Sequence, residues 1–298
     1  MLQNVIGGTR SMQDQQYQDY ILTLLQKIEE AEAIIVGGAA GMSAAAGLNW
    51  YEADETFQQY FGEFADKYGI DSIFYGFYHP FEAKEERWAY IATLIKYVYE
   101  TEAGQTYLDL KELLQEKDYF VLTTNQDAQF SKVFPQENVA AIQGDWRYFQ
   151  CSRRCHDQIY WNKELVENMY QNIEETSIPT ELIPTCPVCG HELEPWVRSR
   201  VFLEGNDFRN ELIKFQLFLA KNKYKNILFL ELGVGTMTPM FIKEPFWELT
   251  ETLPLASYIS INPNDAVIPK KIENKGLAIN EDIAQVLHDA LIKKREIS

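Results

Sequence analysis

Five short runs of apolar residues, rich in β-branched side chains, stand out along the chain. Each run is too short for a helix and ends in small or polar residues, a pattern that predicts strands buried on both faces of a sheet. The predicted strands are 33–36, 119–122, 139–142, 226–232 and 258–261.

Between these runs, apolar residues recur at every third or fourth position, which is the spacing of one helix face. Strands that alternate with helices predict an α/β fold with a doubly wound parallel sheet, covered by helices on both faces. In such sheets, ligands bind beyond the carboxyl ends of the strands. Residues 1–13, rich in Gln, Gly and Asn, are expected to form a loose tail. Helices are expected at 17–30, at 209–221 and at 283–291, with several packed helices between 57 and 114.

The balance of charges narrows the classes of partner. The chain of 298 residues carries 27 Lys and Arg against 44 Asp and Glu, a formal net charge of −17. Nucleic acids and anionic membranes bind clustered positive charge, so neither is an expected partner. No apolar run approaches the ~20 residues of a membrane helix. The N-terminus also lacks a signal-peptide pattern, so we expect a soluble, cytoplasmic protein.

Four cysteines stand in two closely spaced pairs, C-x3-C and C-x2-C. In a cytoplasmic chain such pairs predict metal ligands, and four thiolates predict one closed, structural zinc site. A redox C-x-x-C motif is the alternative, but it leaves the other pair unexplained. His156 and His191 flank the pairs and are expected beside the ligands or facing solvent. The expected ligands are Cys151, Cys155, Cys186 and Cys189.

The first predicted strand runs into the small-residue segment GGAAGMSAAAG at 37–47. Small side chains let backbone N–H groups approach a phosphate, and a following helix N-terminus adds a positive dipole. The segment matches neither G-x-G-x-x-G nor the lysine-containing P-loop. A tight strand-to-helix turn that needs small residues only for packing remains an open alternative.

Polar or small tips follow other strands too, at 123–127 (TTNQD), 233–239 (GVGTMTP) and 261–264 (INPN). Asn125 is suited to hold a ligand hydroxyl or an ordered water, although Asn and Asp at such tips more often cap the next helix. No imidazole base is expected at the tips, because all four histidines lie elsewhere. They are His79, His156, His191 and His288.

Taken in order, these motifs resemble those of the sirtuin family, from about Ala33 to Leu291. The segment 39–47 resembles the loop G-A-G-[IV]-S-x-x-S-G, and 123–127 resembles T-Q-N-I-D. The cysteine pairs match the family's zinc module. Gln143-Gly144 stands where sirtuins have a catalytic His-Gly, Gly235-Thr236 resembles part of G-T-S, and Ile261-Asn262 resembles I-N.

The departures from the family pattern point to one branch. Ala39 replaces the first loop glycine, Gln143 replaces the catalytic histidine, and N-W-Y-E at 49–52 replaces P-D-F-R. The macrodomain-linked (class M) sirtuins share these departures. That resemblance implies NAD-dependent protein ADP-ribosylation of a lipoylated, glycine-cleavage-H-like carrier, with a macrodomain hydrolase as the partner that reverses the mark. It extends to segments at 57–70, 76–78, 85–90, 150–156 and 231–235.

The resemblance implies a Rossmann-like sirtuin fold in three parts. The NAD-binding domain is expected at 1–145, with a helical insertion at about 55–115, and continues at 201–298, while 146–200 form the small zinc module. NAD is expected as a co-substrate in the cleft between the large and small parts. The residues expected to bind it are Gly38, Ala39, Ala40, Gly41, Ser43, Ala44, Asn125, Gln126, Asp127, Gln143, Gly235, Thr236, Asn262 and Asp282.

Three of these residues are expected to be catalytic. Asn125 would position the nicotinamide ribose or a water near it, Asp127 would orient the loop and the nicotinamide amide, and Gln143 would hold ribose hydroxyls. Sirtuin deacylation needs a histidine that takes a proton near neutral pH, and a glutamine side chain cannot do so. ADP-ribosyl transfer is therefore favoured over lysine deacylation. A catalytically inactive NAD sensor is the third hypothesis.

The acceptor side is expected to involve aromatic and basic residues near the cleft. Because the net charge of −17 repels an acidic carrier, any attraction must be local. The alternative is that the aromatics are core residues and the arginines pair with neighbouring glutamates. The candidates are Trp50, Tyr51, Arg198 and Arg200.

Overall fold

Six parallel strands form the main sheet in the computed structural model, which describes residues 2–236 and 238–297. The strand order is β3-β2-β1-β7-β8-β9, and each neighbouring pair runs parallel. All five predicted strands are present; the sixth, β9, was missed. The strands are β1 (Ala33–Gly38), β2 (Tyr119–Thr123), β3 (Val139–Ala141), β7 (Ile227–Leu232), β8 (Ser257–Ile261) and β9 (Gly276–Ile279).

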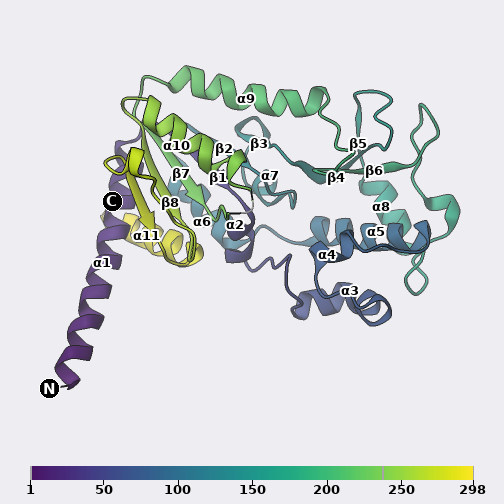
Figure 1. Cartoon of the computed structure of the whole chain (residues 1–298), viewed down its shortest axis with the longest axis horizontal. Helices are drawn as coiled ribbons and strands as arrows, with labels where there is room; N and C mark the ends of the chain where they lie inside the picture. The colour runs from purple at the N-terminus through teal and green to yellow at the C-terminus, as the bar shows by residue number, and fades with distance from the viewer. Residues whose placement is uncertain (1, 237, 298) are drawn as a thin grey trace.

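Helices cover both faces of this sheet, as predicted for a doubly wound fold (Figure 1). Alternate residues of β1 enter opposite cores: Ile34 and Val36 pack on one face, and Ala33 and Ile35 on the other. On the first face lie α1 (Leu2–Glu30), α6 (Gln105–Leu114) and α11 (Ile283–Ile297), and on the second lie α9 (Asn206–Asn222) and α10 (Lys243–Thr252).

The N-terminal helix differs from its prediction. The predicted helix over 17–30 ends at Glu30 as expected, but α1 begins at Leu2, so the loose tail expected at 1–13 is wrong for residues 2–13. Adding residues to an existing helix costs far less than starting one, so a segment with little amphipathic pattern can continue α1. Figure 1 shows the N-terminal turns of α1 leading away from the rest of the molecule.

A helical layer follows β1 and α2 (Ala40–Ala45), as the aromatic periodicity predicted. The Asp54 carboxylate accepts a hydrogen bond from the Phe57 N–H at 2.8 Å and starts α3, which ends at the left-handed Gly69. Ten residues of α5 are buried, because this helix lies between α3 and the second sheet. The layer consists of α3 (Glu55–Tyr68), α4 (Ile73–Phe77) and α5 (Lys84–Glu100).

A second, three-stranded antiparallel sheet has the order β5-β4-β6. Its core meets α5 through an edge-to-face contact of Trp88 and Phe149, with centroids 5.4 Å apart. The helix α9 packs on both sheets, since Phe215 contacts the large core and Phe208 the ring of Phe202 near β6. The strands are β4 (Gly144–Cys151), β5 (Ile159–Trp161) and β6 (Leu193–Val197), with α8 (Lys163–Gln171) between β5 and β6.

The remaining elements are short. Besides α7 (Gln129–Val133), the described residues form four 3-10 turns: η1 (Gln136–Asn138), η2 (Thr180–Leu182), η3 (Pro239–Phe241) and η4 (Lys270–Ile272). Across residues 2–236 and 238–297, none of the helices combines the length and the apolar character needed to cross a membrane. The division of the chain at 145/146 and at 200/201 stays a prediction.

Candidate functional site

A cavity of about 380 Å³ lies at the carboxyl edge of the large sheet. The residues that form its polar wall follow β1, β2, β3 and β7, which is where a parallel sheet is expected to bind ligands. The wall therefore brings together most of the site residues predicted from the sequence. They are Ala39, Ala40, Ser43, Asn125, Gln126, Asp127, Gln143 and Gly235, with Thr124 beside them.

The opposite wall of the cavity is aromatic. Its rings contact one another: Tyr51 lies 5.0 Å from Phe74, and Phe77 lies 4.8 Å from Trp146, between ring centroids. The aromatic richness of this region was interpreted as helix packing, so most of the wall was missed, although Trp50 and Tyr51 were candidates. The wall consists of Trp50, Tyr51, Phe74, Phe77, Tyr78, Trp146 and Phe241, with Leu94 and Thr238.

Three predicted residues form a hydrogen-bonded cluster in the polar wall. The Asn125 Nδ2 donates to the carbonyl of Ala39 at 3.0 Å and to the Ser43 hydroxyl at 2.9 Å. The Ser43 hydroxyl in turn donates to the Asp127 carboxylate at 2.5 Å. Asn125 does not cap α7, whose N-cap residue is Ala128. Asp127 makes a local bond as well, because its Oδ1 accepts from the Gln129 N–H at 3.1 Å.

Asp127 is a buried carboxylate whose ionisation is disfavoured. Burial raises its pKa above the ordinary value of 3.8, although the hydrogen bond from Ser43 acts in the opposite direction. Among the described residues, Asp127 forms no ion pair. A buried acid of this kind at a cavity wall is typical of functional sites.

Small residues in the loop at 37–47 are needed for packing, as the strand-to-helix-turn interpretation predicted; the phosphate-binding interpretation stays a prediction. The Gly41 N–H donates to the Gly233 carbonyl at 3.0 Å, and a Cβ on Gly41 would lie 2.6 Å from the Gly233 Cα. A Cβ on Gly38 would similarly lie 2.3 Å from the Phe130 ring. Gly41 brings α2 against the end of β7, and Gly38 lets the Phe130 ring of α7 pack on β1; like Ala44, neither lines the cavity.

Three predicted NAD-binding residues also lie outside the cavity lining. The Asn262 Oδ1 accepts from the N–H groups of Asn264 and Asp265 at 3.1 and 3.2 Å and holds the loop after β8. The Asp282 carboxylate accepts from the Gln285 N–H at 2.9 Å, at the start of α11. Thr236 follows the cavity residue Gly235. The NAD-binding roles of Thr236, Asn262 and Asp282 stay predictions.

Gln143 is held by its backbone, which leaves its side chain at the cavity. The Gln143 carbonyl accepts from the Arg198 N–H at 2.8 Å and from the Gln126 Nε2 at 3.1 Å. The Arg198 guanidinium pairs with Glu204 at 2.5 Å and stacks 4.3 Å from the Phe202 ring, yet it also lines the cavity. As expected, no histidine of the described chain lines this cavity.

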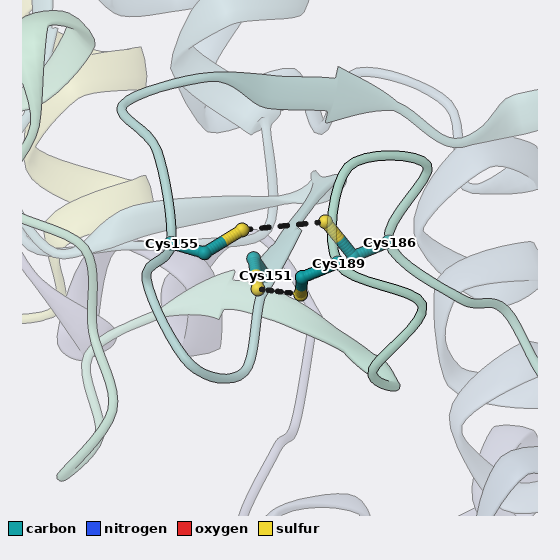
Figure 2. Close-up of side chains that lie close together, drawn as sticks. All are labelled: Cys151, Cys155, Cys186 and Cys189. Atoms are coloured by element: carbon teal, nitrogen blue, oxygen red, sulfur yellow. Dashed lines mark hydrogen bonds between the residues drawn. The ribbon is translucent and has the colours of Figure 1, made fainter.

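The four cysteines converge where β4 ends and β6 begins (Figure 2). Their Sγ atoms all lie within 4.8 Å of one another, and all four are free thiols. The nearest sulfurs are 3.5 Å apart (Cys151 and Cys189) and 3.7 Å apart (Cys155 and Cys186), far beyond the ~2.05 Å of a disulfide bond. Four convergent thiols fit a closed tetrahedral zinc site, as predicted.

A solved complex of a Sir2 homologue with NAD resembles this structure, with a TM-score of 0.57 and 17% identity over 92% of this chain and 94% of that chain. The architecture is therefore the sirtuin fold. No family model matches the sequence.

Two curated relatives carry the comparison further. A protein ADP-ribosyltransferase of Staphylococcus aureus (strain Mu50 / ATCC 700699) is 34% identical over 268 residues, covering 89% of this chain and 84% of the relative. A probable bifunctional ADP-ribose hydrolase/ADP-ribosyltransferase of Fusarium oxysporum f. sp. cubense is 26% identical over 279 residues, covering 87% of this chain and 46% of that protein. The chain belongs to the sirtuin-type, NAD-dependent protein ADP-ribosyltransferases.

Proposed function

We propose that this protein transfers ADP-ribose from NAD to a lipoylated carrier protein and releases nicotinamide. The observation that carries the choice of transfer over deacylation is the polar wall itself. It presents amides and hydroxyls, and in the described chain it contains no histidine. Deacylation by a sirtuin needs a base that titrates near neutrality. The one carboxylate of the wall, Asp127, has both oxygens engaged in hydrogen bonds.

The reaction exchanges one bond at C1′ of the nicotinamide ribose. The bond to the pyridine nitrogen breaks and its electron pair leaves with nicotinamide, while an acceptor nucleophile bonds to C1′ and releases its proton to solvent. Asn125 and Gln143 hold the ribose, since an amide oxygen accepts hydrogen bonds from ribose hydroxyls. Asp127 supports this arrangement through Ser43. A side chain that only holds the ribose suffices for this step.

The aromatic wall supports an acceptor with an apolar chain. A lipoyl group is a long aliphatic chain with a dithiolane ring, and Trp50, Tyr51 and Phe74 provide apolar surface beside the polar wall. The phenols of Tyr51 and Tyr78 are uncharged near neutral pH, because their ordinary pKa of 10 is raised further by desolvation. Support for the carrier itself comes from the resemblance to the class M branch.

The polar contacts with the acceptor protein are assigned to Arg198. Arg198 lines the cavity and its Nη1 pairs with Glu204, which holds the guanidinium beside the opening that an acceptor would use. Arg200 is exposed and lies outside the lining. A macrodomain hydrolase remains the proposed partner that removes the mark; the name of the Fusarium relative, which couples a hydrolase to the transferase, supports this pairing.

The function is tested by incubating the protein with NAD labelled in its ADP-ribose part and with three acceptors. These are a lipoylated carrier, the same carrier without lipoyl, and an acyl-lysine peptide. We expect label on the lipoylated carrier only, and no deacylated peptide. Efficient deacylation by the wild type would overturn the proposal, and label on no acceptor would favour an NAD sensor.

Variants of Gln143 sharpen this test. Gln143→Ala is expected to reduce transfer by about tenfold, because it removes a side chain that holds the ribose, a loss on the scale of one hydrogen bond. Gln143→His is expected to leave deacylation absent, since the chain also departs from the deacylase pattern at 49–52. A deacylase produced by Gln143→His alone would show that the missing base is the only barrier.

A further inference from the structure

The hydroxyl of Tyr107, on α6, contacts two residues of the polar wall from the side away from the cavity. It is 3.2 Å from the Ser43 Oγ and 3.5 Å from the Asn125 Nδ2, whereas Tyr107 itself has no exposed surface and does not line the cavity. We propose that Tyr107 is a positioning residue for ADP-ribosyl transfer. Its hydroxyl donates to Ser43 and so holds the Asn125 amide with its oxygen toward the cavity. This inference rests on the proposed function.

The direction of each hydrogen bond follows from counting protons. Ser43 has one hydroxyl proton, which it gives to the Asp127 carboxylate at 2.5 Å. Asn125 Nδ2 can only donate, and it does so to Ser43 at 2.9 Å. The remaining neighbour of Ser43 is Tyr107, so the bond between their hydroxyls must run from Tyr107 to Ser43. Tyr107 thus satisfies the second lone pair of the serine oxygen.

The same count fixes the orientation of the Asn125 amide. Its two Nδ2 protons go to the Ala39 carbonyl at 3.0 Å and to Ser43. If the amide were flipped, its oxygen would face the Ala39 carbonyl oxygen, and two acceptors would repel each other. No donor within the described ranges bonds to Asn125 Oδ1, so that oxygen is available to a ligand hydroxyl or a water in the cavity.

The Tyr107 hydroxyl keeps its proton and its ring is held in place by packing. Burial raises the pKa of this phenol far above its ordinary value, so the proton stays on the oxygen. Its ring packs edge-to-face on Phe130, with centroids 4.8 Å apart. The neighbouring Thr106 hydroxyl donates to the Ala45 carbonyl at 3.0 Å, so α6 is bonded to the helix that carries Ser43. Removing the hydroxyl therefore deletes a bond and leaves the packing.

The first test compares two variants that each remove one fully buried hydroxyl. Tyr107→Phe is expected to lower kcat for nicotinamide release about 3- to 10-fold, the scale of one lost hydrogen bond. The KM for NAD should stay within about twofold, because direct contacts with NAD are unchanged. The control is Tyr90→Phe, whose hydroxyl donates to the Ile73 carbonyl at 2.9 Å and which, like Tyr107, does not line the cavity. Equal loss of kcat in both variants would overturn the inference, as would a change confined to KM.

A double-mutant cycle then tests the route through Ser43. If Tyr107 acts by donating to Ser43, Tyr107→Phe should cost little further activity in a Ser43→Ala background. Fully additive losses would show that Tyr107 acts by another route and would overturn the inference.

A readout without turnover separates this inference from the proposed function. In ¹⁵N-labelled protein, the side-chain NH₂ signals of Asn125, assigned by their loss in Asn125→Ala, should shift in Tyr107→Phe and stay unchanged in Tyr90→Phe. A wild type that releases no nicotinamide contradicts the proposed function, and these signals still decide the inference. Unchanged Asn125 signals in Tyr107→Phe would overturn it.

Discussion

Two clusters of ionisable groups, one at an edge of each sheet, are stabilised in opposite ways. At the edge of the six-stranded sheet, Asp127 is held by neutral donors and, among the described residues, forms no ion pair. At the edge of the three-stranded sheet, four thiols converge within 4.8 Å, a donor set suited to zinc. A metal ion compensates thiolate charge almost completely, whereas neutral hydrogen bonds compensate a buried carboxylate only in part.

The two sheets also differ in how much buried apolar surface stabilises them. Every residue of β1, β2 and β7 is buried, and both faces of the large sheet are covered by apolar cores. In the small sheet, β5 has three residues, none of them buried. From this comparison we expect that the large sheet tolerates an incompletely compensated acid, while the small sheet depends on a metal held by its four cysteines.

The largest effect is expected from removing one cysteine ligand, which should unfold the small sheet and leave the large sheet folded. Cys186→Ser should release the zinc and destabilise residues 144–197, since structural zinc contributes on the order of 10 kcal/mol to small metal-dependent modules. Hydrogen exchange followed by mass spectrometry should then show lost protection in β4 and β6 with protection kept in β1 and β7. Val188→Ala, in the same turn but exposed, should keep its metal and serves as the control. Metal-free protein with both sheets protected would contradict the comparison.

The next effect concerns catalysis at the large sheet. Asn125→Ala should lower nicotinamide release about 10²- to 10³-fold, the scale of one lost preorganised polar group, with an unchanged midpoint of thermal unfolding. Asp54→Ala is the matched control, because Asp54 does cap its helix and should lower the midpoint without changing kcat. If Asn125→Ala mainly lowers the midpoint, its side chain is structural.

The smallest expected effect is the loss of folding stability caused by burying the ionised Asp127 carboxylate. Its folded pKa is raised above 3.8, so the native state binds this proton more tightly than the unfolded chain does. The wild type should therefore lose stability relative to Asp127→Asn as pH rises from about 3.8 through the raised pKa, and the difference should be constant above it. Urea unfolding of both proteins across the acid range gives this difference. Parallel stability curves would show that burial of Asp127 costs nothing.

The strands of the large sheet were predictable because burial on both faces leaves a continuous apolar run. β9 was missed because its apolar run, at 277–279, has three residues and only one β-branched side chain. The helices α8 and α10 also went unpredicted, because each is only nine or ten residues long and spans too few turns for a clear apolar repeat.

Sequence and structure contributed different parts of the site. Polar residues at strand ends, and cysteine pairs with metal-binding spacing, could be identified from the chain alone, since topology brings strand ends together and spacing reflects ligand geometry. The aromatic wall could not, because an aromatic residue at helical spacing looks the same whether it faces a core or a cavity. Nor could the role of Tyr107: its hydroxyl meets Ser43 across 64 positions of sequence. Contacts at that separation depend on how α6 packs against α2, and only the folded chain brings those helices together.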